Sequence, residues 1–198
     1  MPSKDINVKP RRKLKRSLPG DKKTLRREHD VASMIRVNHA GEYGAKRIYE
    51  GQLAVLGDDP KIRNLLKHMS EQELVHLDYF EKEIVRRGVR PTALHPLWHA
   101  AGYALGALTA RLGPEAAMAC TVAVEEVISS HYKDQLDILD EKPEEKELRG
   151  KIRKFKAEEE EHHDIGLKHK AKEAPAYPLL SALIRGGAKL AIEIAKRI

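Results

Sequence analysis

The chain has 198 residues, of which 34% are charged and only 5% aromatic, and this length suffices for one domain with a sizeable core. Its single cysteine, Cys120, excludes an internal disulfide and favours a reducing compartment. The net charge is +7, much of it near the N-terminus, where no apolar signal-peptide core follows Met1.

Residues 1–29 are predicted to form a mobile basic arm that precedes a single domain at residues 30–198. The arm has ten Lys or Arg residues between positions 9 and 27, against one acid, Asp21. It would serve as a solubilising tail or be attracted to anionic lipid headgroups, at about 1 kcal/mol per basic residue. Nucleic-acid binding is not expected, because the arm has no aromatic side chain to stack on bases.

A first helix is predicted from Asp30, as N-cap, to Gly57. Steps of three and four residues place Glu42 on its inward stripe. The stripe consists of Ile35, Asn38, Glu42, Ala45, Tyr49 and Leu56.

A second helix is predicted to begin at Asp59-Pro60, a cap followed by proline at the first helical position, and to end at Gly88. Its inward stripe carries the motif Glu73-x-x-His76. The stripe consists of Ile62, Leu66, Met69, Glu73, His76 and Phe80.

The segment from Pro91 to Ala110 has no formal charge, and its 20 residues would barely span a bilayer. Because it also contains Pro96, Gly102 and Gly106, we interpret it as a crossover helix that packs partly on the bundle and is partly available to a membrane surface. His95 and His99 are expected to be surface or interface groups.

A third bundle helix is predicted from Gly113-Pro114 to about Asp140, with Glu125 and Tyr132 on its apolar stripe. A fourth is predicted from Pro143 to about Lys172 and carries a second motif of the same spacing. Its inward stripe consists of Leu148, Ile152, Phe155, Glu159, His162 and Gly166. The alternative frame, Glu160 and His163, shares its stripe with basic residues and is predicted to face solvent.

The last segment, Tyr177 to Ile198, is predicted to be a basic amphipathic helix. Its apolar face consists of Leu179, Leu183, Leu190, Ile194 and Ile198. Such a helix either packs on the bundle or, with the crossover helix, lies on a membrane surface, and we favour the membrane.

Four helices thus supply Glu42, Glu73-x-x-His76, Glu125 and Glu159-x-x-His162, with the two motifs 86 residues apart. One Glu-x-x-His is weak evidence, but the repeated set matches the ligands of ferritin-like di-iron and di-manganese bundles. Burying an unpaired carboxylate costs roughly several kcal/mol, and bound divalent cations would offset this cost. The sequence therefore predicts an all-α, ferritin-like four-helix bundle with a two-metal site, a crossover helix and a C-terminal amphipathic helix.

Three segments resemble the demethoxyubiquinone hydroxylase family of ubiquinone biosynthesis, and the resemblance covers about residue 33 to the C-terminus. They are Ile35-Arg-Val-Asn-His-Ala-Gly-Glu-Tyr-Gly-Ala-Lys-Arg-Ile-Tyr49, Ala119-Cys-Thr-Val-Ala-Val-Glu-Glu126 with His131-Tyr132, and Glu159-x-x-His162-His-Asp-Ile-Gly-Leu167.

The resemblance implies a di-iron monooxygenase that hydroxylates the ring of demethoxyubiquinone or its quinol, using O2 and NADH as the expected reductant. The implied ligands of two Fe ions are Glu42, Glu73, His76, Glu125, Glu159 and His162. By analogy with related bundles, Glu73 and Glu159 would bridge the metals. His131 and Tyr132 are expected to support the ligands or to carry electrons.

The implied partners are a polyprenyl quinone, O2, a membrane surface, an accessory lipid-binding protein of ubiquinone biosynthesis and a second copy of the chain. The expected location is peripheral, on the cytoplasmic face of a bacterial inner membrane, or alternatively on the matrix side of the mitochondrial inner membrane. Two other functions remain open: a ferroxidase or iron-storage protein on the same bundle, and an accessory lipid- or partner-binding protein with a vestigial site.

Overall fold

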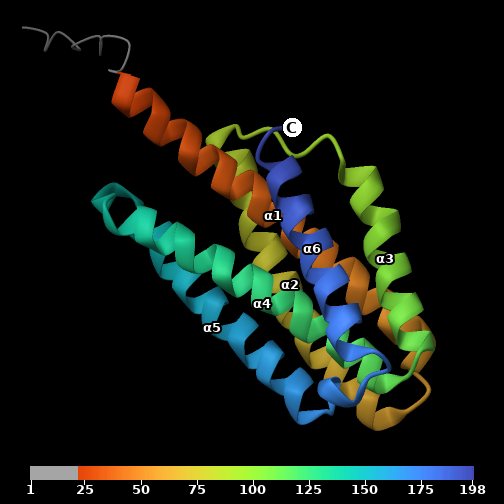
Figure 1. Cartoon of the computed structure of the whole chain (residues 1–198). Coiled ribbons are helices and arrows are strands. Elements are labelled where there is room, and N and C mark those ends of the chain that lie inside the picture. The colour runs from red at the N-terminus through yellow and green to blue at the C-terminus, as the bar shows by residue number, and fades with distance from the viewer. Residues whose placement is uncertain (1–21) are drawn as a thin grey trace, which may run out of the picture.

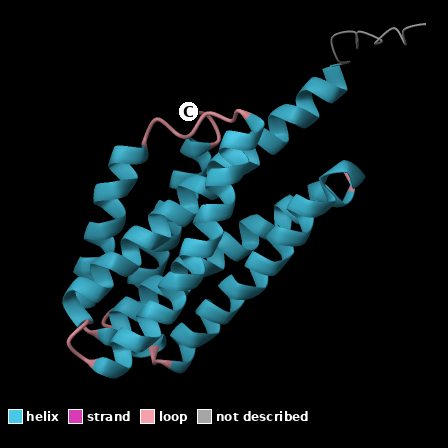
Figure 2. Ribbon diagram, turned by 180° about the vertical axis from the view of Figure 1, so that it is seen from behind, coloured by secondary structure: helices cyan, strands magenta, loops and turns pink. Residues whose placement is uncertain are grey.

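The computed structural model describes residues 22–198, with side chains described from Asp30 onward, and all regular structure in this part of the chain is helical (Figures 1 and 2). The all-α prediction is confirmed. The elements are α1 Lys22–Leu56, α2 Pro60–Arg87, α3 His95–Arg111, α4 Pro114–Asp140, the 3₁₀ turn η1 Pro143–Glu145, α5 Lys146–Lys168, the 3₁₀ turn η2 Ala171–Glu173, and α6 Tyr177–Ala195.

Local chemistry explains the ends of α2, which lie where they were predicted. The Asp59 carboxylate accepts the backbone N–H of Lys61 at 2.8 Å, and Pro60 occupies the first helical position. The helix ends at Gly88, which adopts the left-handed conformation with φ 63°.

The predicted start of the first helix and the predicted end of the fourth bundle helix were wrong. Helix α5 also begins at Lys146 rather than at Pro143, which lies in the preceding 3₁₀ turn. Helix α1 begins at Lys22, not Asp30, because no glycine or proline interrupts residues 22–29 and the helix continues through Asp30. Residues 1–21 of the predicted arm lie outside the described part. Helix α5 ends at Lys168 rather than near Lys172, because Lys170 takes the left-handed conformation with φ 65°.

Four helices form the bundle, as two hairpins joined by a crossover (Figure 1). Helix α1 packs against α2, and α4 packs against α5, each pair being connected by a short loop. Helix α3, in the connection from α2 to α4, lies along α1, while α6 lies along α4. This is the crossover topology that a ferritin-like bundle requires.

Glycines let α3 approach α1 closely. A Cβ at Gly106 would collide with the backbone of Ile48, and one at Gly51 would collide with the backbone of Tyr103. The two helices therefore meet backbone to backbone, which fixes α3 against the bundle.

The bundle core consists of two apolar clusters, with the predicted ligands between them. On α2, Leu66 and Met69 belong to one cluster and Phe80 to the other, with Glu73 and His76 in the interval. On each of the other bundle helices, the candidate ligands likewise lie between residues of the two clusters. Because apolar layers close both ends, the polar side chains between them are shielded from water.

The outer helices differ from the bundle helices in what they expose. On α6, Leu179, Leu183 and Leu190 are each more than 60% exposed, while Ile184 is buried against the bundle. Helix α3 likewise exposes Leu108 at 62%. In the described residues, no helix has both the length and the apolar character needed to cross a bilayer.

Candidate metal centre

The bundle brings all six predicted ligands together at its centre. Each is at most 1% exposed. Their donor atoms form two groups, and within each group the atoms lie within 4.8 Å of one another. The first group consists of Glu42, Glu73, His76 and Glu159, and the second of Glu73, Glu125, Glu159 and His162.

The shared members of the two groups are Glu73 and Glu159. The Nδ1 atom of His76 lies 3.1 Å from Glu159 and 3.8 Å from Glu73. The Nδ1 atom of His162 lies 3.1 Å from Glu73 and 3.4 Å from Glu159. Each of these two carboxylates therefore faces both histidines, which is the position that a bridging ligand requires, while Glu42 and Glu125 each belong to one group.

The outer nitrogens of both histidines contact side chains that the sequence analysis did not single out. His76 Nε2 lies 2.9 Å from the Glu158 carboxylate, and His162 Nε2 lies 2.8 Å from Gln72 Oε1. Both partner oxygens are acceptors, so each Nε2 carries the proton and donates it. In the neutral form of each ring, this tautomer leaves the Nδ1 lone pair directed toward the carboxylates, as metal ligation requires.

Two tyrosines link the halves of the chain reciprocally. Tyr49 on α1 donates its hydroxyl to Glu125 on α4 at 3.0 Å, and Tyr132 on α4 donates to Glu42 on α1. The pairing gives Tyr132 a direct contact with a predicted ligand. Tyr49 lay on the predicted stripe, but its helix alone could not reveal a partner on another helix.

His131 lies farther from the ligands. Its Nε2 contacts Gln135 at 2.8 Å, and Gln135 exchanges two buried hydrogen bonds with Asn38 on α1, at 2.7 and 2.9 Å. Burial lowers the pKa of His131 to about 4. The residue is therefore neutral and belongs to a polar clamp between α1 and α4.

The crowded carboxylates alter one another's protonation. Burial, and next the charge of Glu159, raise the pKa of Glu73 and of Glu125 well above the usual range. Burial alone would lower the pKa of His76, but the neighbouring carboxylates of Glu159 and Glu42 raise it to about 11. Without metal, the centre therefore retains protons at neutral pH.

The polar atoms at the centre lack partners that a cation would supply. Among the described residues, eight buried ligand atoms have no hydrogen-bond partner. They are Glu42 Oε2, both carboxylate oxygens of Glu73 and of Glu159, Glu125 Oε2, and Nδ1 of His76 and of His162. Four carboxylates carry four negative charges, which two divalent cations would neutralise. The residues therefore fit a two-metal site of hard oxygen and imidazole ligands.

The alternative residues considered in the sequence do not join the centre. Glu160 is exposed and pairs with Lys156, and His163 contacts Asp164 at the surface. His99 accepts or donates a hydrogen bond at 2.6 Å with Tyr43 on α1. These observations agree with the outward frame and the interface role that the sequence predicted.

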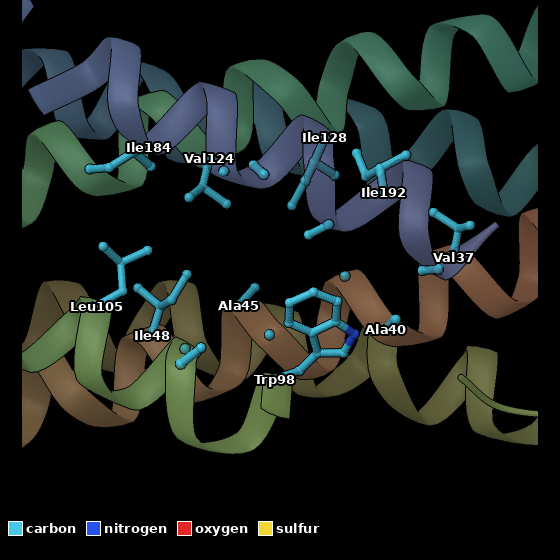
Figure 3. Close-up of a pocket in the computed structure, with 18 of the residues that line it drawn as sticks. Val37, Ala40, Ala45, Ile48, Trp98, Leu105, Val124, Ile128, Ile184 and Ile192 are labelled. Atoms are coloured by element: carbon cyan, nitrogen blue, oxygen red, sulfur yellow. The ribbon is translucent and has the colours of Figure 1, made fainter. Parts of the chain in front are cut away.

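An apolar cavity of about 560 Å³ lies between the outer helices α3 and α6 and the bundle helices α1 and α4 (Figure 3). Helices α6 and α4 form one side of it and α1 and α3 the other, and the Trp98 ring of α3 lines the space. Its lining includes Gly41 and Val124, the residues directly before the candidate ligands Glu42 and Glu125. The cavity therefore borders α1 and α4 next to two of the candidate ligands.

Comparison with known proteins gives a family match over almost the whole described chain. The family model "Ubiquinone biosynthesis protein COQ7" matches residues 29–195. A relative from Rhodospirillum rubrum, named 3-demethoxyubiquinol 3-hydroxylase, is 54% identical over 170 residues, which is 85% of this chain and 78% of that relative.

Mitochondrial relatives match over a similar range. A human relative, named NADPH-dependent 3-demethoxyubiquinone 3-hydroxylase, is 52% identical over 85% of this chain and 78% of its own length. A yeast relative, named 5-demethoxyubiquinone hydroxylase, is 41% identical over 83% of this chain and 77% of its own length. With this extent of identity and the family match, the chain belongs to the COQ7 family of ubiquinone biosynthesis proteins.

Proposed function

We propose that the protein is a di-iron monooxygenase that hydroxylates the ring of demethoxyubiquinol or demethoxyubiquinone. The observation that carries the proposal is the set of six buried ligands, whose unpartnered atoms converge on two positions in a chain of this family. The hydroxylase names of the relatives give the substrate class.

Glu42, Glu73, His76, Glu125, Glu159 and His162 would hold the metals. Two iron ions, when bound, supply the redox chemistry that divides O2 between the ring and water. A ring C–H becomes C–OH, and the second oxygen atom leaves as water with two electrons and two protons from a reductant. The apolar layers above and below the ligands keep bulk water away from this reaction.

The reductant is proposed to be a nicotinamide nucleotide. NADH is the reductant expected from the sequence, whereas the human relative is named as NADPH-dependent. Comparing the two nucleotides at equal concentration with the purified protein decides between them.

The apolar cavity is the proposed substrate site. About 560 Å³ of space lined by small and aliphatic side chains suits a quinone ring and the start of a polyprenyl tail. Its lining comes from α1, α3, α4 and α6, and α3 and α6 also expose leucines to the outside. A lipid-soluble substrate would enter between these two helices.

The same exposed leucines support the proposal that the protein binds peripherally to a membrane. The bacterial and mitochondrial relatives leave both predicted locations open, the bacterial inner membrane and the mitochondrial inner membrane. An accessory lipid-binding partner and a homo-oligomer also remain proposals.

A single-turnover experiment tests the function. The protein is loaded with ferrous iron under anaerobic conditions and mixed with a short-tailed demethoxyquinone and NADPH or NADH, and isotopically labelled O2 is then admitted. We expect a quinone product with one labelled oxygen, formed by the native protein and not by Glu159→Ala. Oxygen consumption with unchanged quinone would instead favour the ferroxidase function.

If the protein neither takes up oxygen nor retains iron, the centre is vestigial. That result would favour the accessory lipid- or partner-binding role.

A further inference from the structure

The two halves of the chain place one residue behind each histidine in a crossed arrangement. Positions 72 and 158 correspond, because each directly precedes the glutamate of a Glu-x-x-His motif. Gln72 contacts the histidine of the second half, His162, at 2.8 Å, and Glu158 contacts that of the first half, His76, at 2.9 Å. Both partner side chains are partly buried.

The geometry of these two contacts matches, but their charge does not. At position 158 the acceptor is a carboxylate, and at position 72 it is a neutral amide. A carboxylate that accepts the outer N–H of a ligating histidine makes the imidazole a stronger electron donor than an amide does. The histidine on the first metal position therefore has an anion behind it, and the histidine on the second does not.

The rest of the centre does not reproduce this asymmetry. Each metal position has one terminal glutamate, and each of these accepts a tyrosine hydroxyl from the opposite half, Glu42 from Tyr132 and Glu125 from Tyr49. The glutamates at 73 and 159 belong to both positions. Lys154 lies 3.2 Å from the other oxygen of Glu158, but its side chain is 60% exposed, so solvent weakens its effect.

We propose that Glu158 and Gln72 are positioning residues that make the two metal positions unequal, with the stronger metal binding at the His76 position. This inference rests on the proposed metal centre and adds to it an order of loading. Outer partners of ligating histidines typically change metal affinity about 10- to 100-fold. We therefore expect about a tenfold preference for the His76 position.

The test measures where metal binds when it is scarce. The full metal-free chain is crystallised after addition of one equivalent of Co²⁺, and anomalous scattering gives the occupancy of each position. We compare the native protein with Glu158→Gln, which removes the charge but keeps the shape, and with Gln72→Glu, which adds a charge behind His162. The double variant moves the charge from one histidine to the other.

The native protein is expected to show about tenfold higher occupancy at the His76 position. Either single variant should bring the two occupancies close to equality, and the double variant should reverse their order. Glu160→Gln is the matched control, because it removes one charge from the exposed side of α5 and should leave the native preference unchanged.

Equal occupancy in the native protein would overturn the inference, and so would a preference that both single variants leave unchanged. If Glu158→Gln fails to fold, Gln72→Glu alone decides, because its added carboxylate must still bring the ratio toward one. A separate titration to two equivalents distinguishes the hypotheses. Failure to bind two ions removes the metal centre and the proposed function together, whereas two ions with an unaltered preference reject only the role of Glu158 and Gln72.

Discussion

Helices α5 and α6 are both amphipathic, but they place their apolar sides differently. Helix α5 turns its apolar side toward the bundle, whereas α6 exposes much of its apolar side. Helix α5 buries its predicted apolar stripe, from Leu148 through Phe155, completely. Helix α6 instead exposes Leu179, Leu183 and Leu190 and buries Ser181, Ile184 and Ala195. The orientation of an amphipathic helix is therefore not determined by its apolar side alone.

The difference comes from what each helix can pack against. The stripe of α5 contains Glu159 and His162, whose partners lie only at the bundle centre, so the stripe must face inward. Helix α6 carries no such residue and lies over the apolar cavity, which it lines with small residues and with Leu180, Leu183, Ile184 and Ile192. Leu179 and Leu190 lie outside this lining and are more than 60% exposed.

We expect the largest effect from a substitution in the polar part of the inward stripe of α5. Glu159→Ala removes a candidate ligand that belongs to both metal groups, so we expect loss of bound iron. Hydroxylation should fall by at least about 100-fold, because losing an outer partner of a ligating histidine typically costs about 10- to 100-fold and losing a ligand should cost more. Iron stoichiometry and product formation measure it. Glu160→Ala, one residue along on the exposed side, should retain both, and equal losses in the two variants would contradict the assignment.

The apolar part of the same stripe determines stability. Phe155 is 1% exposed, so Phe155→Ala is expected to lower the free energy of unfolding by about 3–5 kcal/mol. Leu183→Ala on α6 should change it by less than about 0.5 kcal/mol, because that side chain is 67% exposed. Urea unfolding measures both, and equal costs would show that α6 packs its leucines inward in solution.

The free energy of unfolding should depend on pH through the buried ionisable groups of the metal centre. Helix α6 contributes nothing to this dependence, because none of its buried residues is ionisable. The pKa of His76 in the folded, metal-free protein is raised to about 11, whereas the unfolded chain loses that proton near its ordinary value of 6.5. The stabilisation is thus complete below pH 6.5 and is lost as the pH rises toward 11. The raised pKa of Glu73 acts in the same direction.

We therefore expect the metal-free protein to lose up to about 1.4 kcal/mol per pH unit between pH 7 and 9 for the proton on His76. His131, with its lowered pKa, adds no slope there, because it is neutral in both folded and unfolded states. Urea titrations at several pH values measure the slope. The iron-loaded protein is the control and should be flatter, since metal replaces the protons. Matching slopes would reject the protonated centre.

Substitutions on the exposed side of α6 should have the smallest effect on stability and a clear effect on membrane binding. Replacing both Leu183 and Leu190 by serine should leave the free energy of unfolding within about 1 kcal/mol. Because each buried leucine contributes about 1.5–3 kcal/mol, binding to anionic vesicles should weaken at least about tenfold. Co-sedimentation measures binding. Val75→Ser, at an exposed site on α2, is the control, and undiminished binding of the double variant would refute a membrane-facing α6.

The sequence alone determined the bundle and its set of candidate ligands. The caps at Asp59 and Gly88 gave the ends of α2, and the spacing of apolar residues around each Glu-x-x-His placed the candidate ligands on inward faces. These features could be predicted because they depend on contacts within one helix, where position along the chain gives position in space. The wrong ends, at Asp30 and near Lys172, were placed at residues that are neither glycine nor proline, so neither residue by itself stops a helix.

Only the tertiary structure decided which side chains of the first two bundle helices contact those of the last two. The contacts of Tyr49 with Glu125, of Gln72 with His162 and of Glu158 with His76 join residues 76 to 90 positions apart. Such contacts depend on the rotation and axial shift of one helix relative to another, which periodicity within a helix does not fix. The same reason left the outward leucines of α6 undecided, because its orientation depends on the cavity that four helices build together.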